Sequence, residues 1–342
     1  MRSVVVNSTV RAYRSRISES GEEISPLHYW GYEPQANDYL LGHRQTRFEI
    51  LLRHYITGGV DPCVFLKTIF GLVRGSRALY LVTQPDLIKT LPLLRRLFPR
   101  IAIITWVWTA REAIQWNRYL MHCSHILALT EPAKYQLSLL GLGERSSLAI
   151  WGCDPHYYTQ GYSHESQQQV TTEAIFIGLT KRDLELVRCA ALDGRFQVRV
   201  GQKSFSLLGA LPNTVICNLN SRKGLLDALY GSNVSLIPLL PGEPDPAGYT
   251  NLVESLLCGT AVVIADSSTI PEVVLSLPGV YRYRTSDPSS FLDTLALAVR
   301  ESAVDGRRIH IRTCAAGLLN GSRLRSIVAS TMKCGALHLF NS

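Results

Sequence analysis

The sequence predicts an α/β fold in which two parallel sheets are each covered by helices. Two observations support this prediction. Short runs of aliphatic residues alternate with stretches at helical spacing along the chain, which is the pattern of a parallel sheet with helices on its faces. The alternation stops at residues 155–172, a polar stretch rich in Gln, Ser and Tyr, and then restarts. Two Rossmann-like halves joined by a linker are therefore expected, with ligands at the carboxyl ends of the strands.

The first half is expected to span residues 1–154, and its elements follow from runs of aliphatic residues and from helical spacing. Residues 17–40 are polar and predict a long loop after the first strand. Proline near the start marks two of the predicted helices. Strands are predicted at 4–6, 78–82, 101–104, 125–129 and 148–151, and helices at about 43–55, 84–98, 109–121 and from 131 onward.

The second half is expected to span residues 173–321, followed by a C-terminal helix within 322–342. The chain from about Ser289 onward has a helical pattern. The same rules give strands at 174–177, 196–200, 213–217, 234–237 and 261–265, and helices at 181–192, 222–231 and from Thr250 to the turn at Gly259.

Composition limits the class of protein. The chain has 342 residues, of which 46% are hydrophobic and 18% charged, as in globular proteins of two domains. No apolar run approaches the ~18 residues of a membrane span, and the apolar stretch near the N-terminus is too short for a signal peptide. A cytoplasmic protein is therefore expected, with peripheral contact at a membrane left open. The net charge of +8 suits an anionic partner, but the cations are dispersed, which disfavours nucleic acid.

The most informative segment runs from Pro246 to Asp266. A small-residue turn that includes Gly248 and Tyr249 leads into a helix whose first residues are Thr250 and Asn251. The N–H groups of a helix N-terminus are unpaired and favour an anion. Glu254 lies on the same face, four residues after Thr250 and three after Asn251, where its carboxylate could accept two hydrogen bonds from a ribose diol. Phosphate and ribose together predict a nucleotide; the alternative is that Glu254 only complements the helix dipole.

This segment resembles the donor-site motif of retaining GT-B glycosyltransferases of the family 4 type (glycosyltransferase group 1), which use nucleotide sugars. The resemblance implies that Glu254 binds the donor ribose. The family pattern places another glutamate eight residues earlier, where this chain has Pro246, and Asp245 and Glu243 lie close enough to replace it. The resemblance also implies a GT-B fold, with two Rossmann-like domains facing across a cleft and a last helix that crosses back to the first domain.

A second part of the resemblance is the segment that follows the strand at 174–177. Gly178 frees the loop, and Lys181 and Arg182 lie where a helix is predicted to begin. The resemblance implies that these cations neutralise the donor diphosphate, and fixed charges of this kind lower the barrier to departure of the leaving group. The alternative is a pair of solvated helix-start residues beside Asp183. The catalytic candidates are Arg182, Lys181 and Glu254; the donor-binding candidates are Gly178, Asp245, Gly248, Tyr249, Thr250, Asn251 and Glu254.

The acceptor side is expected in the first half. Trp106 and Trp108 follow a predicted strand, where an aromatic ring could stack on a sugar, and Arg111 could bind an anionic acceptor. Packing anchors are the alternative for both tryptophans. His28 is a further acceptor-side candidate from the long loop.

The expected function is transfer of a sugar from a nucleotide-diphosphate sugar to a small-molecule, glycan or lipid-linked acceptor, with retention of configuration as the resemblance implies. No cofactor is expected besides the co-substrate, and no metal, because no acidic pair or Cys/His ligand spacing is present. A non-catalytic module that binds a nucleotide sugar or a partner protein is the alternative, favoured by Pro246 at the place of the first glutamate. A Rossmann oxidoreductase is disfavoured, because no GxGxxG follows a strand.

Overall fold

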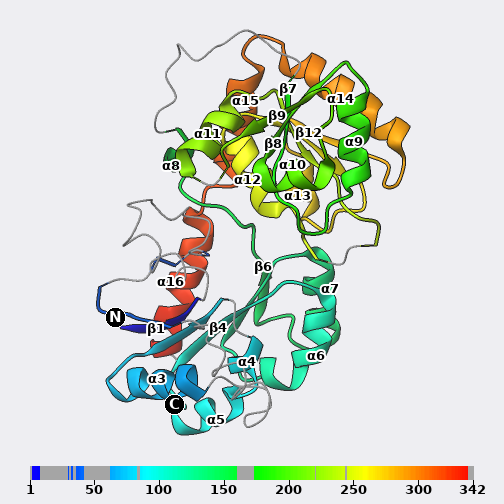
Figure 1. Cartoon of the computed structure of the whole chain (residues 1–342). Coiled ribbons are helices and arrows are strands. Elements are labelled where there is room, and N and C mark those ends of the chain that lie inside the picture. Colours follow the sequence, from blue (N-terminus) through cyan, green and yellow to red (C-terminus); the bar gives the residue numbers. More distant parts are fainter. Residues whose placement is uncertain are drawn as a thin grey trace. The chain divides into compact units, whose positions relative to one another are not determined.

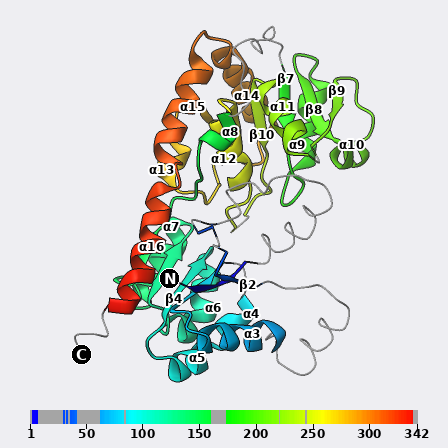
Figure 2. The same ribbon diagram turned by 90° about the vertical axis from the view of Figure 1, so that its left-hand side faces the viewer.

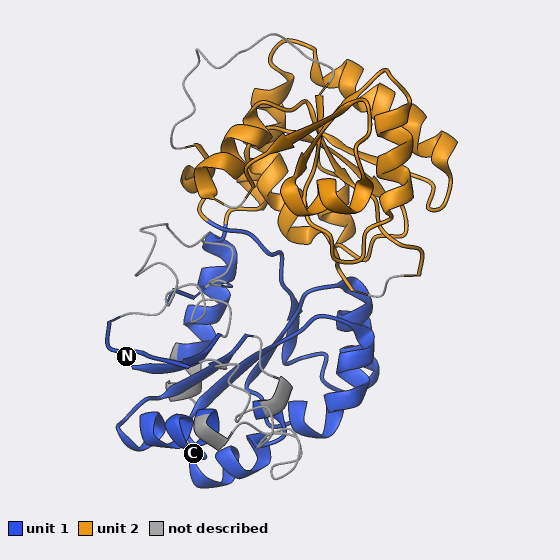
Figure 3. Cartoon of the chain, viewed as in Figure 1, with its two compact units in different colours: residues 1–153, 321–342 blue, residues 154–320 orange. Residues whose placement is uncertain are grey.

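The computed structural model describes residues 2–7, 30, 32–33, 36–41, 62–82, 85–159, 173–219, 221–242 and 245–337. The chain forms two compact units, shown in different colours in Figure 3. Unit 1 consists of residues 1–153 together with 321–342, and unit 2 of residues 154–320.

Unit 1 contains a parallel sheet in the order β2-β1-β3-β4-β5-β6 (Figure 1). Its strands are β1 (Ser3–Val6), β2 (Tyr39–Leu41), β3 (Ala78–Leu81), β4 (Ala102–Val107), β5 (His125–Ala128) and β6 (Ser146–Leu148). The helices are α3 (Pro62–Val73), α4 (Pro85–Ile88), α5 (Leu91–Leu97), α6 (Ala110–Leu120), α7 (Glu131–Leu139) and α16 (Ser322–Leu337), the last of which packs on β4.

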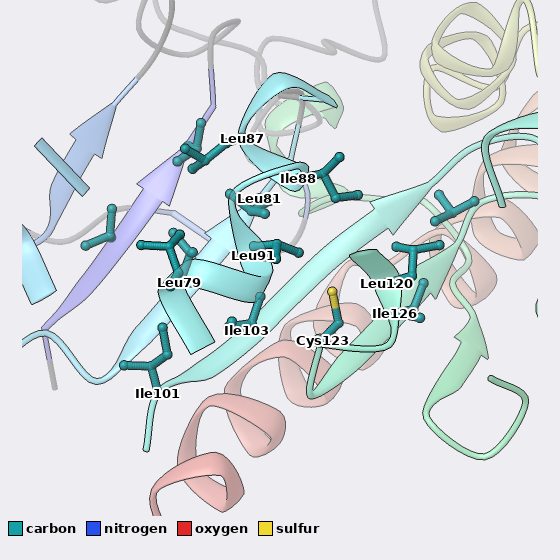
Figure 4. Close-up of a cluster of buried hydrophobic side chains, with 14 of the residues drawn as sticks. Leu79, Leu81, Leu87, Ile88, Leu91, Ile101, Ile103, Leu120, Cys123 and Ile126 are labelled. Carbon is teal, nitrogen blue, oxygen red and sulfur yellow. The ribbon is translucent and has the colours of Figure 1, made fainter. Parts of the chain in front are cut away.

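The core of unit 1 explains why these strands are continuous aliphatic runs. Every residue of β1, β3 and β4 is buried, as expected for a sheet covered on both faces. On one face, Leu79, Leu81 and Ile103 pack against Leu91 of α5 and Leu120 of α6 (Figure 4).

Unit 2 contains a second parallel sheet in the order β12-β11-β10-β7-β8-β9. Its strands are β7 (Glu173–Phe176), β8 (Gln197–Gly201), β9 (Thr214–Cys217), β10 (Val234–Ile237), β11 (Ala261–Ala265) and β12 (Val280–Tyr283). Its helices are α8 (His156–Thr159), α9 (Leu184–Leu192), α10 (Gln202–Leu208), α11 (Arg222–Tyr230), α12 (Tyr249–Leu257), α13 (Glu272–Leu275), α14 (Pro288–Ser302) and α15 (Arg307–Leu318). The chain runs outward through β8 and β9 on one side of β7 and through β11 and β12 on the other side of β10, so β7 and β10 form the topological switch point, where ligands of such sheets bind.

The structure confirms the α/β class and the two parallel sheets, and it corrects several elements of unit 1. A strand, β2, ends the stretch predicted as a long loop. The helix predicted over 84–98 is two helices, α4 and α5, because Pro92 lies in the first turn of α5 and cannot continue a helix from before it. The strand predicted at 148–151 is β6 at 146–148. The helix predicted at 43–55 and His28 lie outside the described residues.

Unit 2 also differs from the prediction at particular places. The short helix α8 begins inside the predicted linker, where the backbone N–H of His156 donates to Asp154 Oδ1 at 3.0 Å; residues 160–172 lie outside the described part. The helix predicted from 181 begins at Leu184. Lys181 has a φ of 60°, which breaks a right-handed helix, and the side chain of Asp183 caps the helix instead. The strand β12 and the helices α3, α10 and α13 were not predicted.

Candidate functional site

The candidate site lies in unit 2, where two loops leave the carboxyl ends of the neighbouring strands β7 and β10. Backbone hydrogen bonds join these loops: the N–H of Leu240 donates to Lys181 O at 3.2 Å, and that of Asp183 donates to Pro238 O at 2.9 Å. An isolated bridge pairs Arg182 with Leu239. The pairing fixes the backbone of Arg182 beside the loop that enters α12.

Arg182 is a buried cation, with 8% of the residue exposed. Its Nη1 donates to Thr180 O at 2.8 Å, its Nε has no acceptor, and its Nη2 donates to none of the described residues. Burial lowers the pKa of Arg182 to about 10, so the group stays charged at neutral pH. No carboxylate in the described part of the chain pairs with this guanidinium. An unpaired buried charge is costly, and an anion at this position would offset that cost.

The N-terminus of α12 lies against this guanidinium. Gly248 precedes the helix with a φ of 85°, and no side chain caps the helix there. The N–H groups of Thr250 and Asn251 have no acceptor among the described residues. A Cβ at Gly248 would lie 3.2 Å from Arg182 Nη2 and 2.4 Å from Ile237 Cγ2. Glycine is therefore required, both for its backbone conformation and for the close approach of the cation.

A cation beside a helix N-terminus opposes the helix dipole, which favours negative charge at that end. Here the unbonded Nη2 of Arg182 and the open amides of Thr250 and Asn251 are donors around the same glycine. This arrangement is unfavourable without a ligand and becomes favourable when an anion such as a phosphate lies between the donors.

Asn251 and Gly178 frame the same position. The side-chain Nδ2 of Asn251 donates to Ile177 O, which ties the first turn of α12 to the end of β7. A Cβ at Gly178, whose φ is 80°, would lie 3.1 Å from that nitrogen. Asn251 therefore joins the first turn of α12 to the loop after β7, and the absence of a side chain at Gly178 leaves room for this contact.

Glu254 lies further along α12 and is buried, with 7% of the residue exposed. Its Oε1 accepts a hydrogen bond from the hydroxyl of Tyr158 in α8 at 3.3 Å, and its Oε2 accepts none from the described residues. Burial raises the pKa of Glu254 to about 7, and the Tyr158 hydrogen bond opposes this shift. A carboxyl group with one free oxygen in a buried position can accept hydrogen bonds from ligand hydroxyls.

The side chains of the other donor-side candidates differ in exposure. Tyr249 is buried at 2% exposure and anchors the start of α12. Asp245 and Lys181 are exposed, and Thr250 is half-buried. No group of three or more His, Cys, Asp or Glu that could hold a metal is found in the part of the chain that the structure describes.

Three of the acceptor-side candidates, Trp106, Trp108 and Arg111, lie in unit 1 at the carboxyl end of β4. Trp106 is 2% exposed and its Nε1 donates to the Tyr80 hydroxyl at 2.7 Å, which makes it a packing anchor. Trp30 stacks between Trp108 and Trp151, with ring centroids 5.3 and 4.3 Å away. Trp108 is half-buried and Arg111 is exposed.

Two residues of the site were missed in the sequence. Tyr158 lies in the stretch predicted as a linker. The signal in the sequence was Asp154, whose side chain accepts a hydrogen bond from the N–H of His156 at the start of α8, with the aromatic residues Tyr157 and Tyr158 following. Tyr283 ends β12, a strand that was not predicted. Burial raises the pKa of Tyr283, whereas the charge of Arg182 lowers it, so the phenol lies near the guanidinium.

Comparison of the sequence with known protein families and with curated proteins finds no match. Solved structures, in contrast, resemble the whole chain. HepE from Anabaena, in complex with UDP and glucose, matches with a TM-score of 0.65 at 12% identity, over 98% of this chain and 100% of that one. A glycosyltransferase from Rickettsia africae matches with a TM-score of 0.68 at 10% identity, over 98% of each chain. Sucrose-phosphate synthase from Thermosynechococcus elongatus matches with a TM-score of 0.65 at 11% identity, over 100% and 99%. The chain therefore has the GT-B fold of these glycosyltransferases.

Proposed function

We propose that unit 2 binds the diphosphate of a nucleotide sugar and that the protein transfers the sugar to an acceptor. The observation that carries the proposal is the buried, unpaired guanidinium of Arg182 against the uncapped N-terminus of α12. Support comes from the position of this pair at the switch point of the sheet and from the UDP and UDP-glucose bound by HepE, which has the same fold. UDP and UDP-glucose are accordingly the first ligands to test.

Arg182 and the α12 amides would act on the leaving group. When the bond from the sugar to the diphosphate breaks, negative charge grows on the departing phosphate oxygen. The acceptor oxygen forms the new bond to the sugar, and its proton passes to the departing diphosphate. Donors already oriented in a buried position stabilise the growing charge without reorganising, which lowers the barrier. Glu254 would hold the ribose hydroxyls through its free Oε2.

The finer features of the proposal follow from the sequence resemblance. We propose retention of configuration, no requirement for a metal or other cofactor, and a cytoplasmic protein that acts at a membrane surface on a small-molecule, glycan or lipid-linked acceptor. Assays of transfer from UDP-glucose with and without EDTA, with the anomeric product identified by NMR, test the first two features together.

The Arg182→Gln variant tests the phosphate site. Titration calorimetry with UDP should show a loss of about 10- to 100-fold in affinity, because a hydrogen bond to a charged group contributes about 1.5–3 kcal/mol. Uridine, which lacks phosphate, should bind equally to both proteins. Arg300→Gln is the matched control, since Arg300 is exposed on α14. An unchanged UDP affinity, or an equal loss for uridine, would contradict the phosphate site.

A non-catalytic nucleotide-sugar module is the second candidate. Pro246 occupies the position at which the enzymes that the sequence resembles carry a glutamate, and proline has no side-chain group that could hydrogen-bond to a sugar. The neighbouring Asp245 is exposed. Incubation with UDP-glucose separates the two candidates: slow release of glucose and UDP indicates an enzyme, whereas binding without turnover indicates a module.

A further inference from the structure

The edge of the unit 1 sheet opposite Trp106 and Trp108 has an unusual composition. All strands of this sheet are parallel, so the helices that lead into β3, β4, β5 and β6 all end at the same, amino-terminal edge. These helices are α3, α5, α6 and α7, of which α3 and α5 lie side by side in Figures 1 and 2.

An exposed apolar side chain lies at the end of each of these four helices: it is the last residue of α3, α5 and α7, and it directly follows α6, whose own last residue, Leu120, is buried. The exposed fractions are 69% for Val73, 52% for Leu97, 57% for Met121 and 63% for Leu139. A single exposed apolar residue needs no explanation, but here one recurs at the end of every helix along one edge. On α3 the stripe continues, because Leu66 and Phe70 are 64% and 48% exposed on the side away from the core.

Arginines are interspersed with these apolar residues. An exposed arginine lies just before four of the strands: Arg2 before β1, Arg77 before β3, Arg100 before β4 and Arg145 before β6. Between Pro62 and Arg111 the chain has eight Lys and Arg and a single acid, Asp86.

Of the described acids beside these strand starts, Glu144 is exposed. Asp38 is half-buried, and its carboxylate accepts hydrogen bonds from the N–H of Ser3 and the hydroxyl of Tyr32, both at 2.7 Å. The charge at this edge is therefore predominantly positive.

Hydrogen bonds link neighbouring loops at this edge. The N–H of Arg77 donates to Arg2 O at 3.1 Å, and that of Ala102 donates to Arg77 O at 3.0 Å. Arg145 Nη1 donates to Met121 O at 2.9 Å. Beside them is a recess of about 530 Å³ lined by Arg95, Met121, His122, Cys123, Ser124 and Arg145. We call the exposed residues Val73, Leu97, Met121, Leu139, Arg77, Arg100 and Arg145 the basal surface.

A structural role explains only part of this arrangement. Arg95 donates to the carbonyls of Pro99, Ile101 and His122 and so ties adjacent loops together. Arg77 and Arg100 are exposed, and their charges together with the apolar side chains suit a partner that is both anionic and apolar.

We propose that the basal surface docks on an anionic lipid membrane. The arginines match the lipid phosphates and carboxylates, and the apolar side chains enter the boundary between headgroups and acyl chains. A nucleic acid would use the charges and leave the apolar row in water. No described helix is long and apolar enough to cross a bilayer, so the contact is on the surface of the membrane. The inference specifies the membrane contact of the proposed function, but it does not require sugar transfer.

Co-sedimentation of the full chain with vesicles tests the proposal. The protein should sediment with phosphatidylcholine–phosphatidylserine vesicles and much less with phosphatidylcholine alone, and salt should weaken the binding. Arg100→Glu should reduce the partition coefficient about 30-fold, because each basic charge near an anionic surface contributes about 1 kcal/mol and the reversal changes two charges. A double variant that combines Arg100→Glu with Leu97→Gln should have a still lower partition coefficient.

The matched control is Leu192→Gln with Arg300→Glu, both exposed residues of unit 2. This control double variant should sediment with anionic vesicles as the unmodified protein does. The UDP affinity and the Tm of the control and of the Arg100→Glu, Leu97→Gln double variant should equal those of the unmodified protein. Equal sedimentation with neutral and anionic vesicles, or equal losses for the two double variants, would overturn the proposal. Binding of the unmodified protein to heparin but not to anionic vesicles would also overturn it. Because the readout is independent of UDP, failure of the nucleotide site leaves this result intact.

Discussion

The Glu254→Gln substitution gives the sharpest test of the candidate site, because it acts on stability before any ligand is added. Glu254 is buried on α12, and burial raises the pKa of its carboxyl from 4.5 to about 7. Glutamine keeps the size and the acceptor for the Tyr158 hydroxyl, but it carries no charge at any pH. The variant therefore removes the buried charge and keeps an acceptor for the Tyr158 hydroxyl, and the dependence of its stability on pH isolates the effect of the charge.

The sign and size follow from proton linkage. An acid with a higher pKa in the folded chain binds more protons when folded, so the unfolding free energy falls as pH rises from 4.5 to about 7. Above that range the penalty is complete, and a shift of this size corresponds to about 3 kcal/mol. At pH 4.5 most of this penalty is absent, because the carboxyl is largely protonated in the folded chain. The variant should thus be more stable than the unmodified protein at pH 8 and nearly equal at pH 4.5.

Differential scanning calorimetry without ligand measures this difference. At pH 8 the Tm of the transition of unit 2 should rise by about 6–12 °C in Glu254→Gln, since 1 kcal/mol shifts the Tm of a domain of this size by about 2–4 °C. Glu185→Gln is the control, because the exposed Glu185 forms an ion pair with Arg188 at the surface and such pairs contribute little. A variant less stable than the unmodified protein at pH 8, or a gain that does not depend on pH, would refute the buried charge.

Further predictions concern single contacts. Tyr158→Phe removes the hydrogen bond that lowers the pKa of Glu254, so the pH midpoint of UDP binding should move upward; an unchanged midpoint in a pH series of titrations would rule out this coupling. Gly248→Ala would strain a left-handed backbone and place a Cβ 2.4 Å from an isoleucine methyl, so both Tm and UDP affinity should fall, by more than ~1 kcal/mol of stability; a neutral result would show that the turn can adjust. Trp106→Phe leaves the Tyr80 hydroxyl without its indole donor and should cost about 1–3 kcal/mol in urea unfolding; full stability would mean that the aromatic cluster is not a packing anchor.

The strands were the most predictable part of the fold. Continuous aliphatic runs such as 234–237 and 261–265 are buried on both faces. A strand buried in this way is a continuous hydrophobic run, which can be recognised in the sequence without an alternation of polar and apolar residues. The short edge strand β2 was missed, because only Leu41 of its three residues is buried. The aliphatic signal in the sequence is correspondingly weak there.

The site was predictable to the extent that it depends on local chemistry. A glycine before a helix and an acid inside its second turn were visible in the sequence, and Gly248 and Glu254 occupy those positions. The predicted start of α9 was wrong. Lys181 has a left-handed backbone conformation, which depends on the pairing of its loop with the loop after β10. That pairing joins residues about sixty positions apart, and no local pattern encodes it.

The same long-range pairing turns Arg182 from a solvated helix-start residue into a buried cation. In the first turn of a helix, Arg182 would be exposed to solvent, as the alternative interpretation of the sequence has it. In the structure the bridge to Leu239 places it 8% exposed beside Gly248. Folding alone gains nothing from a desolvated positive charge at the positive end of a helix. Under the proposed function, a bound anion recovers the cost of burying Arg182, and the affinity difference between UDP and uridine measures that recovery.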